Sequence, residues 1–234
     1  MIRSETPTTL ALCGRLPSGL RSHDLEAWFA LGDGGMPVSW IVTPGQVGDV
    51  AARLAASGRV ATLAVEIPHA VTSGGLRKLL DQTRAEAPDL DAAWIMGDLG
   101  PHERRLLVAA GIRVAGTHRL DGSRGSRRPA PPGWRCVSTA WGLWEVLWSS
   151  ASPPGLFSWG RRKVAARGTL TVVDVTAAGA VDAGTLRGRI DRWRSWATGR
   201  ITAGRLHGAT LSELPELITG TAHRPAAGSI LRAA

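Results

Sequence analysis

Seven short apolar segments recur along the 234-residue chain, and helical patterns separate most of them. The segment at 168–176, GTLTVVDVT, is apolar on both faces and has one acid, Asp174, near its end. Such a run predicts a buried parallel strand, and Asp174 then lies at the carboxyl end, where α/β proteins place their chemistry. The other six predicted strands lie at 9–13, 38–42, 60–67, 92–96, 112–116 and 134–138.

Apolar positions three and four residues apart predict the connecting helices. One helix is predicted because Trp141, Trp144 and Trp148 fall at i, i+3 and i+7. Aromatic residues at helical spacing are more often core than ligand platform, so we expect this tryptophan stripe to face the core. The predicted helices span 23–31, 43–56, 76–87, 101–110, 139–150, 185–197 and 210–218.

Strands that alternate with helices predict an α/β fold with mostly parallel strands. Two architectures suit seven such strands, namely an incomplete (β/α)7-type barrel and an open doubly wound sheet. The chain has no GxGxxG after its first strand and no GxxxxGK[ST], so the main reason to expect a nucleotide in a doubly wound sheet is absent. We therefore expect the barrel, as a single domain over 1–234 with its core at about 8–220 and a C-terminal tail at 221–234.

The predicted strand ends carry three acids and two histidines. In a barrel these ends form one rim, which is where barrel enzymes build their active sites. Asp98, Asp174 and His118 are the candidate catalytic residues, as general acids and bases, and Glu66 and His69 are the candidate ligands of a divalent metal. The alternative is that the acids cap loops or pair with arginines of the same rim.

Arginines and tryptophans near the same rim are candidates for ligand binding. The segment at 119–133 has no helical pattern and holds four arginines and three prolines, which is typical of a functional or mobile loop. Its arginines could bind sulfate, phosphate or a uronate, although a solvated loop explains them equally well. The candidate ligand-binding residues are Arg15, Arg119, Arg127, Arg128, Trp134 and Trp159.

Composition narrows the classes of partner. The formal charge of +9 comes almost entirely from arginine, a skew that we attribute to coding bias, and no aromatic-glycine RNA motif accompanies it, which disfavours nucleic acid. No apolar run approaches a membrane span or a signal peptide, so we expect a cytoplasmic protein. Cys13 and Cys136 both lie in or beside apolar runs, so we expect buried, reduced thiols.

The layout resembles the polysaccharide deacetylase (NodB-type) family over roughly residues 9–220. The segment AVEIPHAV keeps the Glu-Ile pair of the family's metal motif at Glu66 and places His69 one residue closer than the pattern, while Ser73 stands where a second histidine is expected. Asp174 lies near the place of the family's late histidine. Two further segments, AGIRVAG at 110–116 and LSELPEL at 211–217, match the family's fifth strand and last helix.

The resemblance implies a barrel of about seven β/α units and a metal-dependent deacetylation. The family's first strand ends in paired aspartates, and TLALCGRLPSG at 9–19 has neither, while GDLGP at 97–101 lacks the family's loop arginine. Two hypotheses follow. The chain is a catalytically degenerate relative, a pseudoenzyme, that binds a glycan or another anionic ligand. Alternatively, it is a metal-dependent hydrolase whose site is rebuilt from other residues at the strand ends.

Overall fold

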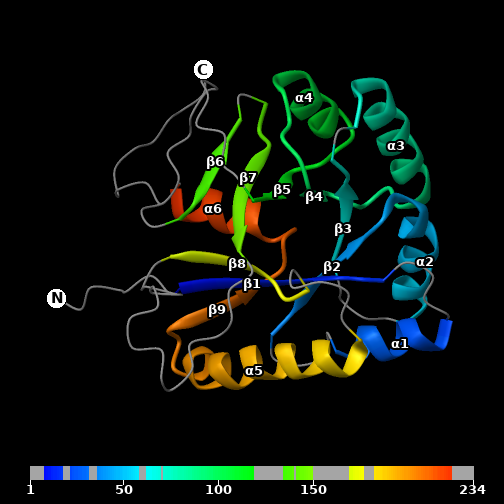
Figure 1. The fold of residues 1–234 in the computed structure, drawn as a ribbon. Helices are drawn as coiled ribbons and strands as arrows, with labels where there is room; N and C mark the ends of the chain where they lie inside the picture. The colour runs from blue at the N-terminus through cyan, green and yellow to red at the C-terminus, as the bar shows by residue number, and fades with distance from the viewer. Residues whose placement is uncertain are drawn as a thin grey trace.

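A closed ring of parallel strands forms the centre of the molecule (Figure 1). The computed structural model describes residues 8–17, 22–31, 36–57, 62–69, 71–118, 134–139, 141–149, 169–176 and 182–222. Within these residues seven strands form the ring in the order β1-β2-β3-β4-β5-β7-β8, and β8 pairs again with β1. They are β1 (Thr8–Arg15), β2 (Val38–Val42), β3 (Thr62–Ile67), β4 (Ala92–Ile95), β5 (Val114–Thr117), β7 (Trp144–Ser149) and β8 (Leu170–Asp174).

Two further strands pair with the ring at its amino-terminal half. The strand β9 (Leu206–Ala209) runs parallel to the first half of β1, and the second half of β1 pairs with β2 instead. The strand β6 (Cys136–Ser138) is antiparallel to the first half of β7, and the second half of β7 pairs with β8. The ring is therefore closed at the carboxyl ends of its strands. At the amino ends, β9 separates β1 from β2, and β6 separates β7 from β8.

Helices cover the outside of the ring, as Figure 1 shows for the series from α1 to α5. Their bounds are α1 (Ser22–Ala30), α2 (Val47–Ser57), α3 (Ser73–Glu86), α4 (Pro101–Ala109) and α5 (Ala183–Thr202), with a 3₁₀ turn η1 (Pro44–Gln46) before α2. The last helix, α6 (Leu214–Ala222), packs against the inner core instead. Just before it, Ser212 Oγ lies 2.5 Å from Asp91 Oδ1, so α6 lies at the amino ends of the strands. None of the described helices is long and apolar enough to cross a membrane.

Side-chain alternation along the strands divides the core into two clusters. The inner cluster includes Ala11 and Cys13 of β1 and Trp94 of β4, and the outer cluster packs the ring against the surrounding helices. Small side chains make room for Trp94, because a Cβ on Gly116 of β5 would lie only 2.6 Å from its ring. The free thiols of Cys13 and Cys136 are buried as expected, and both belong to the inner cluster.

The predicted helix over 139–150 is wrong. Gly142 has a φ of +93°, which ends any helical path, and the following residues form β7. Trp144 and Trp148 are four residues apart, a spacing that suits one face of a helix and one face of a strand equally. Trp141 is 36% exposed and contacts Arg105 at 4.7 Å, so it is not a core residue.

The α/β class and the mostly parallel barrel are confirmed, with seven strands in the ring and closure among the described residues. Six predicted strands occupy expected places, within a few residues at their ends. The predicted strand at 134–138 is β6, which lies off the ring, and β7 takes the expected place in it. The strand β9 was not predicted, because its sequence, LHGA, has no clear apolar pattern.

Candidate functional site

Four polar side chains extend from strand ends at the carboxyl end of the barrel, two of them from the neighbouring strands β1 and β8. For each of the four residues, the residue two or four positions earlier in the chain lies in the inner core. Side chains two positions apart on a strand point to the same face of the sheet, so the four side chains point into the barrel. The four residues, here named the mouth layer, are Arg15 of β1, Glu66 of β3, His118 just after β5 and Asp174 of β8.

Arg15 and Glu66 form an ion pair within the mouth layer. The Nε atom of Arg15 lies 2.8 Å from Oε2 of Glu66, and the two side chains are 29% and 20% exposed. The N–H is not aimed at the carboxylate, so neither atom has a hydrogen-bond partner among the described residues. The Nη2 atom donates to Sδ of Met96, after β4, at 3.0 Å, and a thioether is a weak acceptor.

The carboxylate of Asp174 is fixed by its own loop. Thr176 donates to Oδ1 from its backbone N at 2.8 Å and from its Oγ1 at 2.5 Å. The Thr176 Oγ1 in turn accepts from the backbone N of Arg15 at 3.1 Å, which ties β8 to β1. Asp174 is 3% exposed, yet Oδ2 has no hydrogen-bond partner in the described part of the chain. Burial, and secondly the charge of Asp174, raise the pKa of the neighbouring Cys13 thiol well above its ordinary value.

Two tryptophans lie beside the mouth layer. The rings of Trp94 and Trp148 stack with centroids 5.1 Å apart and an interplanar angle of 27°. The His118 ring lies 6.3 Å from that of Trp148. Both indole N–H groups are buried and neither has a hydrogen-bond partner among the described residues. Trp148 is partly exposed, whereas Trp94 is fully buried.

Unpartnered buried polar atoms are therefore concentrated in one place. Ten such side-chain atoms occur in the described residues, and five of them belong to the mouth layer or to the tryptophan pair. Two of these five, Arg15 Nε and Glu66 Oε2, lack a hydrogen bond but face each other in the ion pair. A buried polar group without a partner costs roughly 1–3 kcal/mol, so native proteins satisfy nearly all of them with protein, water or ligand. Hydrogen-bond donors and acceptors lie together here, as the binding of a polar ligand requires.

The metal site that the deacetylase resemblance implies does not fit these residues. Glu66 already faces a guanidinium, and His69 is exposed beyond the end of β3. Within the described ranges no three His, Cys, Asp or Glu side chains are grouped so that they could hold a metal ion. The expected pair of Glu66 and His69 thus gains no third ligand there, and no chemical step is derived through a metal.

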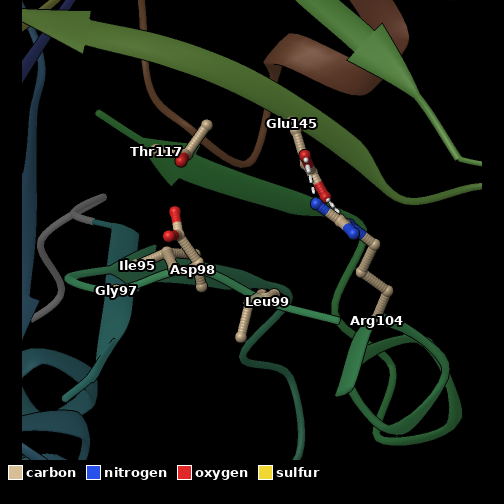
Figure 2. Close-up of a pocket in the computed structure, with 7 residues that line it drawn as sticks. All are labelled: Ile95, Gly97, Asp98, Leu99, Arg104, Thr117 and Glu145. Carbon is tan, nitrogen blue, oxygen red and sulfur yellow. Dashed lines mark hydrogen bonds and ion pairs between the residues drawn. The ribbon is translucent and has the colours of Figure 1, made fainter. Parts of the chain in front are cut away.

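Asp98 does not join the mouth layer. Figure 2 shows that it lines a cavity outside the barrel wall, where its carboxylate points toward Thr117 of β5. The cavity has a volume of about 260 Å³ and lies between the loop after β4, the helix α4 and the outer faces of β4, β5 and β7. A buried ion pair of Arg104 on α4 and Glu145 on β7 forms one wall, with two N–O contacts marked in Figure 2.

Four of the candidate ligand-binding residues, Arg119, Arg127, Arg128 and Trp159, lie outside the described residues. Trp134 is 6% exposed and packs in the inner core, which leaves it little surface for a sugar ring. The prediction missed Trp94, Trp148 and Thr176. The alternation in WEVLW could have identified Trp148 as inward-facing, but the helical interpretation of the same residues concealed it.

Comparisons with known proteins add no identification. No protein-family model matches the chain, and no curated protein matches it.

Proposed function

We propose that the carboxyl end of the barrel binds an uncharged carbohydrate, as a glycan-binding relative of the deacetylases that does not use their metal. The observation that carries the proposal is the concentration of unpartnered polar atoms in the mouth layer and the tryptophan pair. These atoms include acceptors, on Glu66 and Asp174, and donors, on Arg15 and both indoles. A sugar hydroxyl donates and accepts hydrogen bonds, so a polyhydroxylated ring can satisfy both kinds.

The aromatic pair favours a sugar over a small polar solute. Trp148 is partly exposed and is held flat against the buried ring of Trp94. An indole face offers a large apolar contact at low conformational cost, and the C–H face of a pyranose matches it. Binding sites typically combine such an apolar wall with a few placed polar groups. Trp148 would supply the wall, and Asp174 would supply an oriented acceptor.

Charge favours a neutral ligand over the anionic one that the sequence also allowed. The mouth layer has two acidic side chains, Glu66 and Asp174, against the single guanidinium of Arg15. A uronate or phosphate would add another negative charge near a buried carboxylate, where the effective dielectric constant is low and repulsion is strong. The arginines that motivated the anionic ligand, Arg127 and Arg128, lie outside the described residues.

The test is a calorimetric titration of soluble neutral oligosaccharides built from glucose, mannose or N-acetylglucosamine, each against its uronate counterpart. Saturable binding of a neutral sugar is expected. Asp174→Asn should weaken it about tenfold or more, because an acceptor loses its charge-assisted hydrogen bond. The matched control is Asp98→Asn, in the cavity outside the barrel, which should bind as the wild type does.

A second pair of variants tests the aromatic wall. Trp148→Ala should abolish measurable binding, whereas Trp141→Ala removes an exposed tryptophan on the same turn-and-strand segment and should leave binding unchanged. If Trp148→Ala and Trp141→Ala change sugar affinity equally, the ligand binds elsewhere. The same holds if Asp174→Asn and Asp98→Asn change sugar affinity equally. Absence of binding to every sugar in the panel would refute the proposed function.

A further inference from the structure

A groove with a volume of about 600 Å³ opens at the amino end of the barrel. Its lining includes Thr62, the first residue of β3, and Asp91, which directly precedes β4. The rest of the described lining comes mainly from the last two turns of α2 and from the end of α3 with the loop that follows it. The mouth layer lies at the opposite, carboxyl ends of the strands, so the groove is separate from the proposed carbohydrate site.

The lining of this groove is mainly apolar and incompletely covered. Ala52 and Ala55 of α2 are exposed, and Leu63 and Leu90 are only partly buried against the outer core. Apolar surface that is open to solvent and bordered by polar groups is a feature of interaction sites, because a partner that covers it removes apolar area from water.

The charged part of the lining is acidic. Glu86, Asp89 and Asp91 line the groove, and no lysine or arginine does so among the described residues. The chain as a whole has a formal charge of +9, so the groove differs in sign from the average of the molecule. Both α2 and α3 also end beside it, and the C-terminal end of a helix carries a partial negative charge. The groove therefore favours a cation at its border.

Asp89 is the acid that is most available to a partner. Glu86 accepts a hydrogen bond from the backbone N of Gly48 at 3.1 Å, and Asp91 has Arg113 Nη1 at 3.7 Å from its Oδ2. Asp89 is exposed, and its side chain makes no hydrogen bond or ion pair within the described ranges. A cationic side chain seated beside Asp89 would thus gain a counter-charge without displacing an existing contact.

We propose that this groove docks a segment of a partner protein that inserts an aliphatic side chain between α2 and α3 and places a lysine or arginine beside Asp89. The aliphatic side chain gains stability by burial against Ala52, Leu63 and Leu90. The cation sets the register of the segment, since complementary charge contributes mainly to specificity. A nucleic acid or an anionic lipid surface would meet acids of its own sign here, which disfavours both.

The experiment selects a phage-displayed library of random dodecapeptides on the immobilised full-length protein, with Ala52→Trp as the counter-selection target. The enriched peptides should share an aliphatic residue close to a lysine or arginine. A synthetic, fluorescently labelled copy of the consensus should bind the wild type saturably in an anisotropy titration. Exchange of its cationic residue for glutamate should weaken binding about tenfold or more, because the exchanged side chain then faces acids of the same sign.

Two pairs of variants locate the peptide. Ala52→Trp fills the groove and Asp89→Lys reverses its most available charge, so each should weaken peptide binding about tenfold or more. The matched controls Ala56→Trp and Asp81→Lys change exposed residues of α2 and α3 that do not line the groove, and they should bind the peptide as the wild type does.

Three results would overturn the proposal. They are a selection that enriches no peptide over Ala52→Trp, a consensus without a cation, and binding that Asp89→Lys leaves unchanged. Sedimentation velocity covers the remaining occupant, a second copy of this chain. A wild type that self-associates while Ala52→Trp stays monomeric would assign the groove to that copy instead of a partner protein. Each of these results leaves the carbohydrate site untouched.

Discussion

The ion pair of Arg104 and Glu145 gives the sharpest stability prediction. The side chains are 11% and 4% exposed, and the pair joins α4 to β7 across the outer core. Glu145→Gln should remove the carboxylate that faces the buried Arg104 guanidinium. Breaking a buried pair in this way costs about 3–5 kcal/mol, because the remaining charge keeps its desolvation penalty. The adjoining cavity of about 260 Å³ admits water, so we expect a value near 3 kcal/mol.

The assay is equilibrium unfolding in urea, followed by far-ultraviolet circular dichroism. The matched control is Asp49→Asn, which breaks an exposed pair with Arg53 (side chains 60% and 35% exposed) and should cost under about 1 kcal/mol. The double replacement Arg104→Met with Glu145→Leu should recover most of the loss, since apolar residues of similar volume replace buried pairs at little cost. A loss below about 1 kcal/mol for Glu145→Gln would refute the reasoning, since the pair would then behave as a solvated one.

Three other predictions concern the inner core and the mouth layer. Gly116→Ala should destabilise the fold by about 1–3 kcal/mol in urea unfolding, because the new Cβ would overlap the Trp94 ring. Thr176→Val should weaken sugar binding without a comparable loss of stability in the same melts, because Asp174 loses a hydroxyl donor that orients it. Cys13 and Cys136 should react with a thiol reagent only after denaturation. Burial raises the pKa of Cys136 to about 12 and that of Cys13 above its ordinary value. Above a pH of about 9 the thiols of the unfolded chain ionise more readily than those of the folded chain, so the free energy of unfolding should fall as the pH rises.

The barrel was predictable because buried parallel strands leave a strong signal in sequence. Their apolar runs, such as 38–42 and 92–95, do not depend on distant residues. The strand β7 was not predictable in the same way, because Trp144 and Trp148 suit a helix and a strand alike. Gly142, which ends the helical path, carries no such signal on its own, since glycine is tolerated inside helices at a cost of about 1 kcal/mol.

The candidate site was predictable as a set of strand ends but not as a set of contacts. Arg15, Glu66, His118 and Asp174 all come from the strand ends at the carboxyl side, as predicted. Asp98 also follows a strand, yet the loop after β4 turns it to the outside of the barrel wall. Which of these residues meet depends on strand register and on side-chain direction, and local sequence determines neither. The contact between Arg15 and Glu66 therefore required the structure.

The most direct test of the proposed carbohydrate site uses the indole N–H groups of Trp94 and Trp148. Both are buried without a hydrogen-bond partner among the described residues, so a bound sugar should perturb them strongly. Nitrogen–proton correlation spectra of the indole signals, assigned with Trp94→Phe and Trp148→Phe, can follow them during titration with a neutral oligosaccharide. The account predicts that the signals of Trp94 and Trp148 shift in a saturable way while that of the exposed Trp141 stays in place. Unchanged signals of Trp94 and Trp148 at saturating sugar would contradict it.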